Sequence, residues 1–140
     1  MRIGYARVHV RDHSPDAQHA ALEAAGCERI FLDRTHGALA SRPELADALL
    51  AARPGDELVV TTLDRLAAST RHLIALAGDL QTTGVHLVVL DQGIDTSTPV
   101  GHAFFHTLEA VAAFQRALMS DSTLAGLQAA RVRGRTGGRK

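Results

Sequence analysis

The sequence of 140 residues has no Trp, one Tyr, one Cys and no long apolar run. A single cysteine excludes an internal disulfide. Because no basic residue adjoins Cys27, we expect a partly buried structural thiol rather than a reactive one. No stretch is long and apolar enough for a membrane span, and no signal peptide precedes the first expected strand. We therefore expect a cytoplasmic protein with an aliphatic core and no membrane partner.

Net charge is also absent, but the charges are unevenly distributed. The last ten residues carry five basic groups and no acidic one, which leaves ten basic and fifteen acidic groups, a net charge of −5, in the first 130. A basic tail on an acidic body is typical of a nucleic-acid-binding arm. The alternative is a solvated terminus without a ligand. The basic residues in question are Arg131, Arg133, Arg135, Arg139 and Lys140.

The remaining pattern alternates short apolar strands with amphipathic helices. Such alternation predicts an α/β fold with a mostly parallel sheet of four to five strands and helices on both faces. The expected strands are 2–8, 29–32, 57–61 and 86–90, and the expected helices are 14–25, 41–52 and 69–83, followed by a long helix from Thr98-Pro99 to about Arg133. A Ser41-x-x-Glu44 capping box is expected to open the second helix.

The final helix is longer than a domain of this size needs for its own core. Its apolar positions suggest burial on more than one side and therefore packing against a partner subunit. The alternative is one long helix that covers only its own sheet. These apolar positions include Phe104, Phe105, Leu108, Val111, Leu118, Met119 and Leu127.

Polar residues follow the ends of the expected strands. In parallel sheets, ligands bind at the carboxyl ends of the strands. The first strand also places Tyr5, Arg7 and His9 on one face, because side chains alternate along a strand. A guanidinium beside a reacting group is well suited to holding a phosphate. The other strand ends carry Asp33 with His36, Leu63-Asp64-Arg65, and Asp91.

Several short blocks, collinear over about 130 residues, resemble the catalytic domain of small serine recombinases of the resolvase/invertase family. The resemblance implies an α/β domain in residues 1–100, a long dimerisation helix of the same domain in 101–133 and a basic DNA-binding arm in 134–140. It also places the family's helix-turn-helix reader after Lys140, so none is expected within this chain. The blocks are Tyr5-Ala6-Arg7, Arg42-Pro43, Leu63-Asp64-Arg65-Leu66, Gly93 to Pro99 and Phe114-Gln115-Arg116.

The resemblance further implies that four arginines line a phosphate site beside Asp64. Displacement of one phosphodiester oxygen by another needs a nucleophile and concentrated positive charge. The implied partners are DNA and a second copy of the chain, with a tetramer possible in the family, and the tail would enter the minor groove. The arginines are Arg7, Arg42, Arg65 and Arg116.

This chain departs from the family pattern where catalysis is expected. His9 occupies the position of the nucleophilic Ser, and loss of a nucleophile costs on the order of a million-fold in turnover. Ser14 is expected to cap a helix and not to replace it. We therefore expect a domain that dimerises and binds DNA weakly but does not cut. The other departures are His13 for Gln, His36 for Ser, and Ala68 and Ser122 each for Arg.

Two further hypotheses remain open. His9, His13 and His36 have the composition of a three-histidine zinc site, which would make the chain a metal-dependent hydrolase, natural or engineered. Otherwise no cofactor is expected. The chain could also be a dimerisation module alone. A phosphoramidate formed on His9 is a further chemical possibility.

Overall fold

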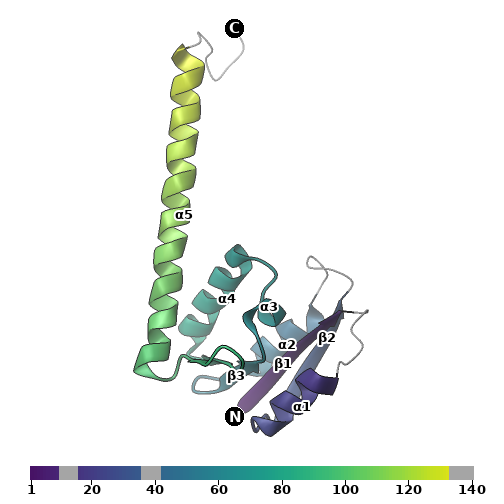
Figure 1. Ribbon diagram of the computed structural model, residues 1–140. Helices are drawn as coiled ribbons and strands as arrows, with labels where there is room; N and C mark the ends of the chain where they lie inside the picture. Colours follow the sequence, from purple (N-terminus) through teal and green to yellow (C-terminus); the bar gives the residue numbers. More distant parts are fainter. Residues whose placement is uncertain (10–15, 36–41, 133–140) are drawn as a thin grey trace.

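The computed structural model describes residues 1–9, 16–35 and 42–132. Helices and strands alternate through most of the chain, and the last helix rises far beyond the sheet (Figure 1). The elements are β1 (Arg2–His9), α1 (Asp16–Ala24), β2 (Arg29–Thr35), α2 (Pro43–Ala51), β3 (Glu57–Val60), α3 (Leu63–Leu66), α4 (Thr70–Thr83), β4 (His86–Val89), β5 (Ile94–Asp95) and α5 (Pro99–Val132).

The five strands form one sheet in the order β2-β1-β3-β4-β5. The first four strands are parallel, and only the short β5 runs antiparallel, to β4. From β1, the chain adds β2 on one side and then β3 and β4 on the other side. The carboxyl ends of β1 and β3 therefore form a topological switch point. The predicted α/β fold with a mostly parallel sheet is therefore confirmed.

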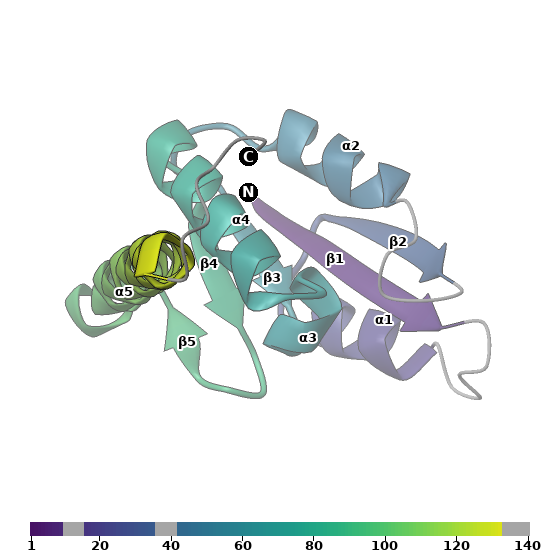
Figure 2. The same cartoon turned by 90° about the horizontal axis from the view of Figure 1, so that it is seen from above.

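Helices cover both faces of this sheet, but unequally (Figure 2). On one face, α2, α3, α4 and the start of α5 enclose the larger core, which includes Tyr5, Leu58 and Phe105. On the other face, α1 contributes the buried Leu22 to a smaller cluster around Ala6 and Val59. The alternation of side chains along β1 therefore turns Tyr5 and Ala6 to opposite cores, as the sequence predicted.

The ends of the helices follow local rules in most places. Ser69 caps α4 by accepting a hydrogen bond from the backbone N–H of His72, and Gly84 ends the helix in the left-handed conformation that favours glycine. Helix α2 starts at Pro43 with Arg42 as N-cap, one residue later than the capping box predicted, and Ser41 of that box lies outside the described residues. The carboxylate of Asp33, from β2, accepts the first backbone N–H groups instead.

Helix α5 is 34 residues long and packs on the domain along its first part, up to about Met119. Phe105 and Ala112 are buried, whereas Val111, Phe114, Leu118, Met119 and Leu127 remain exposed in the single chain. The close approach of Gly101 to the carbonyl of Asp95 leaves no room for a larger residue where the helix begins. No helix in the described ranges is long and apolar enough to cross a lipid bilayer.

Candidate functional site

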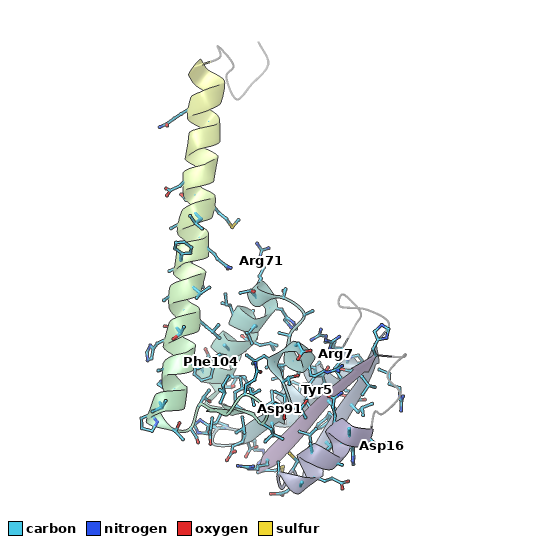
Figure 3. All side chains as sticks on the ribbon, in the orientation of Figure 1. Tyr5, Arg7, Asp16, Arg71, Asp91 and Phe104 are labelled. Atoms are coloured by element: carbon cyan, nitrogen blue, oxygen red, sulfur yellow. The ribbon has the colours of Figure 1, made fainter. Side chains whose placement is uncertain are left out.

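Arg7 lies near the carboxyl end of β1, on the same face as Tyr5 (Figure 3). Its Nη2 donates a hydrogen bond of 2.6 Å to the carbonyl oxygen of Asp64 in α3. The backbone of Arg7 is also held, because its carbonyl accepts bonds from Arg65 Nη1 at 3.1 Å and Gln18 Nε2 at 3.0 Å. The motif at the end of the first strand is thus tied to α1 and α3.

Helix α3 brings Arg42 and Arg65 close to Arg7. Arg42 donates from Nη1 to the carbonyl of Leu66 at 2.7 Å, two residues beyond the carbonyl that binds Arg7. Carbonyl groups at the end of a helix are unpaired and carry partial negative charge, so they attract guanidinium groups. The block Leu63-Asp64-Arg65-Leu66 therefore organises the site mainly through its backbone.

The arginines also repel one another electrostatically. Burial, and then the charge of Arg7, lower the pKa of Arg42. Burial and the charge of Arg42 lower the pKa of His72, which places this histidine near the cluster although no sequence motif pointed to it. A positively charged group so close to its neighbours favours an anion between them.

Two guanidinium nitrogens strengthen that interpretation. Arg7 Nε and Arg42 Nη2 are buried and have no hydrogen-bond partner among the described residues. Buried donors are normally satisfied, and an unsatisfied one costs about 1–3 kcal/mol. Phosphate oxygens are suitable acceptors for such donors, since a guanidinium group matches their geometry. Arg7 and Arg42 are therefore arranged to bind an oxyanion.

Asp33 and Tyr5 are buried next to the arginines and hold this arrangement in place. Asp33 is 3% exposed, and its Oδ2 accepts a hydrogen bond of 2.9 Å from the Tyr5 hydroxyl. The same carboxylate accepts from the backbone N–H groups of Glu44 and Leu45, which fixes the start of α2 and hence Arg42 beside it. Sequence reasoning noted Asp33 at a strand end but assigned no role to either residue.

A shallow hollow of about 370 Å³ adjoins the cluster at the carboxyl ends of the strands. Asp64 and Arg65 reach it from α3, and Asp91 reaches it from the loop after β4, as predicted for polar residues at strand ends. Asp64 Oδ1 accepts a hydrogen bond from Thr62 Oγ1. The complete lining is Ala17, Gln18, Ala21, Thr61, Thr62, Asp64, Arg65 and Asp91.

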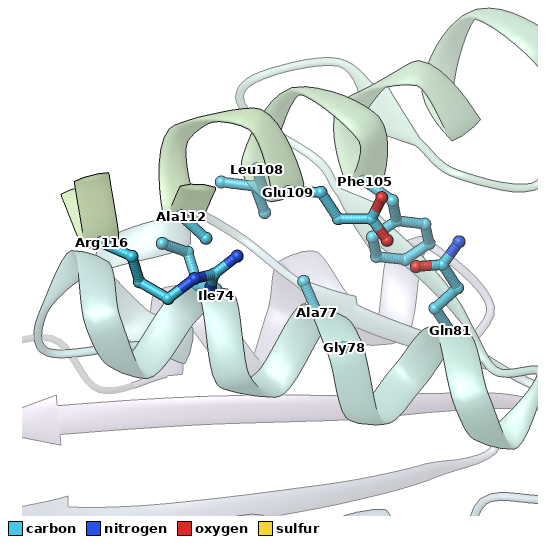
Figure 4. A pocket seen from close by; sticks show the side chains of 9 residues that line it. All are labelled: Ile74, Ala77, Gly78, Gln81, Phe105, Leu108, Glu109, Ala112 and Arg116. Carbon is cyan, nitrogen blue, oxygen red and sulfur yellow. The ribbon is translucent and has the colours of Figure 1, made fainter. Parts of the chain in front are cut away.

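Arg116 lies elsewhere in the single chain. It lines the groove between α4 and α5, beside Ile74 and Ala112 (Figure 4). No contact among the described residues joins it to Arg7, and its membership of the phosphate site stays a prediction.

Other predicted positions are only partly described. His9 ends β1 and is half-buried on the face of Arg7, and Ala68 is exposed beyond α3. Two of the three proposed metal ligands lie outside the described residues, so the zinc site stays a prediction. The same holds for most of the basic tail and, for lack of a described side chain, for Ser122 and Arg131. The positions outside the described ranges are His13, His36, Arg133, Arg135, Arg139 and Lys140.

The sequence is similar to known proteins over nearly its whole length. A sequence model of the family "Resolvase, N terminal domain" matches residues 2–136. The chain belongs to this family. The serine recombinase gin of Escherichia phage Mu is 48% identical over 139 residues, which cover 99% of this chain and 72% of the relative. The DNA-invertase hin of Salmonella typhimurium is 48% identical over 137 residues, 98% of this chain and 72% of the relative.

A solved structure has a similar fold. The N-terminal catalytic domain of TP901-1 integrase superposes with a TM-score of 0.68 at 27% identity, covering 84% of this chain and 98% of that domain. The resemblance predicted from short motifs is thereby confirmed, and the chain is a serine-recombinase domain of the resolvase family. In this domain, hydrogen bonds join Arg7, Arg42 and Arg65 to the same segment around β1 and α3. The assignment of His9 to the nucleophile position stays a prediction.

Proposed function

We propose that this chain is a site-specific recombinase domain that binds DNA and dimerises but does not cut. The observation that carries the proposal is the arginine cluster of Arg7 and Arg42 together with His9 at the end of β1. Guanidinium groups supply the positive charge that a phosphodiester needs, so the proposed function requires no cofactor. Action on DNA, as proposed, supports the expected cytoplasmic location.

The proposed loss of cutting follows from the chemistry of the strand-breaking step. A serine recombinase attacks phosphorus with a hydroxyl oxygen, and the displaced deoxyribose oxygen leaves with the proton. His9 has no hydroxyl group, and Ala68 removes a further guanidinium from the site. Arginines stabilise the charge of the equatorial oxygens but cannot replace the attacking atom. The domain should thus hold a phosphodiester without breaking it.

A stripe along α5 supports association with a second copy. We call it the α5 stripe and define it as Val100, Phe104, Thr107, Val111, Phe114 and Leu118. Its members alternate at intervals of four and three residues, the spacing of a helix seam that packs against another helix. Val100 is 87%, Phe114 62% and Leu118 50% exposed in the single chain. Such exposure of apolar residues on one side favours a helix-to-helix dimer.

The decisive experiment uses a chimera, because the target site of this chain is unknown. Residues 1–140 are fused to the unmatched remainder of the phage Mu relative, and the chimera is tested on that relative's own recombination site. We expect the chimera to bind that site without forming a covalent protein–DNA adduct. His9→Ser combined with Ala68→Arg should restore the adduct, and adding Ser122→Arg should increase it further.

His9→Ala is the matched control, since it lacks a hydroxyl and should bind DNA as the parent chimera does. Adducts are measured on denaturing gels and DNA binding on native gels. A parent chimera that forms as much adduct as the His9→Ser, Ala68→Arg variant would contradict the proposed inactivity. Failure of the parent and all variants to bind the site would contradict the DNA-binding part of the proposal.

A further inference from the structure

Two imidazole rings lie side by side near the start of α5, away from the arginine cluster. His102 and His106 are both exposed and stand four residues apart, with ring centroids separated by 5.3 Å. Residues at this spacing occupy one face of a helix on consecutive turns. Two histidines separated by three residues form the two-ligand pattern of helical zinc sites. The recombinase function described above makes no use of either ring.

Neighbouring side chains constrain both rings. The ring of His102 stands edge-on to buried Phe105, at a centroid distance of 5.8 Å. His106 Nδ1 lies 3.9 Å from Glu109 Oε2, on the next turn of the same face. Histidines that bind metals commonly direct one ring nitrogen to a carboxylate and the other to the ion. At 3.9 Å the two groups are too far apart for a hydrogen bond, so Glu109 could orient His106 only after the two side chains move closer together.

The pair remains accessible when α5 meets a second copy. At about 100° of rotation per residue, His102 and His106 lie about 160° and 120° from the middle of the α5 stripe. Glu109 lies on the same side as the two rings and borders the groove between α4 and α5, where Figure 4 shows it beside Phe105 and Gln81. The histidine pair therefore forms a surface separate from both the α5 stripe and the arginine cluster.

We propose that His102 and His106 bind one divalent first-row transition ion of the Zn²⁺, Ni²⁺ or Cu²⁺ class. Imidazole nitrogen suits these ions and not Mg²⁺ or Ca²⁺. No group of three potential ligands is close enough to hold a metal in the part of the chain that is described. The site is accordingly an open one, in which two protein ligands hold the ion and water fills its remaining positions.

The test is a calorimetric titration of the untagged full chain with zinc chloride. We expect one ion per chain at this site, and loss of that ion in both His102→Ala and His106→Ala. Glu109→Gln should retain binding but weaken it by about tenfold or more, as expected for a carboxylate that orients a ligand. Because the three side chains are exposed, the variants should melt at the temperature of the parent chain.

His19→Ala provides a matched control. His19 is also on a helix and has a carboxylate four residues on, with Nδ1 3.1 Å from Glu23 Oε1, but no second histidine lies one turn away on α1. It should leave zinc binding unchanged. The proposal is overturned if the parent chain binds no zinc, or if His102→Ala and His106→Ala both retain the ion. Loss of zinc in His36→Ala alone would assign the metal to the recombinase pocket and would equally overturn it.

Discussion

At the scale of single residues, the arginine cluster depends on groups that are not themselves basic. Asp33 is buried at the end of β2, where its carboxylate binds the Tyr5 hydroxyl and two backbone N–H groups of α2. Strand periodicity predicted that Tyr5 and Arg7 share a face. It could not predict that Asp33 caps α2. Asp33 and the start of α2 come together only because β2 pairs with β1 and the chain after β2 then folds back over the sheet.

The ionisation of the Tyr5 hydroxyl shows whether the buried hydrogen bond between Tyr5 and Asp33 is formed. Burial, together with the hydrogen bond to Asp33, raises the pKa of Tyr5. Tyr5 is the only tyrosine, and Trp is absent, so ultraviolet absorbance of tyrosinate reports this single residue. We expect the folded chain to resist ionisation well above pH 10, whereas the chain in denaturant should titrate near the ordinary value of about 10.

The same shift makes stability depend on pH. Above about pH 10 the unfolded chain loses the phenolic proton and the folded chain keeps it, so the free energy of unfolding should fall by up to about 1.4 kcal/mol per pH unit. Tyr5→Phe should remove this contribution and cost about 1.5–3 kcal/mol at neutral pH, since the buried Asp33 loses a partner. Ionisation of the folded chain near pH 10 would show that the pair does not form.

At the scale of elements, α5 and α3 differ in how far sequence could predict them. Thr98-Pro99 and a long apolar periodicity indicated the start and length of α5, which begins at Pro99 and continues to Val132. The four-residue α3 and the two-residue β5 were not predicted, because such short elements have no periodicity of their own and are fixed by tertiary contacts. Yet α3 supplies the carbonyl groups that hold Arg7 and Arg42.

The role of the α5 stripe can be tested by introducing charge. Phe114→Asp with Leu118→Asp should convert a dimer to a monomer in sedimentation velocity, because two carboxylates would be buried without partners. Both positions are exposed in the single chain, so its melting as a monomer should change little. Ala113→Asp with Ser120→Asp adds the same charge to exposed positions on another side of the helix and should leave the dimer intact. Equal effects of both pairs would contradict a dimer through the stripe.

At the scale of the whole molecule, an acidic body is joined to a basic tail. The first 130 residues carry ten basic and fifteen acidic groups, a net charge of −5, so the body should repel DNA except at the arginine cluster. This uneven distribution of charge between the body and the tail can be seen in the sequence alone. Motif resemblance predicted the architecture and the recombinase family. The i, i+4 spacing of His102 and His106 permits a shared ligand and also fits an interface or surface pair. Sequence alone could not show which sides of the helix are covered.

Removal of the tail should therefore change DNA affinity in a salt-dependent manner. A chain ending at Val132 lacks Arg133, Arg135, Arg139 and Lys140. For a nonspecific duplex, the slope of log affinity against log salt should become less steep by up to about 0.9 for each phosphate that the shortened chain no longer neutralises. Replacing the four residues by Gln tests charge alone at constant length and should give the same result. An unchanged slope in both would contradict a DNA-binding tail.

The position of β1 between β2 and β3 sets an order of events during synthesis. This strand leaves the ribosome before its neighbours β2 and β3, and the larger core also requires Phe105 from α5. Chains fold as their segments emerge, from the N-terminus onward. The larger core can close only after Phe105 has been made, and the outer part of α5, with Phe114 and Leu118, emerges after Phe105. A nascent chain thus completes its own interior before it displays the surface on which a second subunit could assemble.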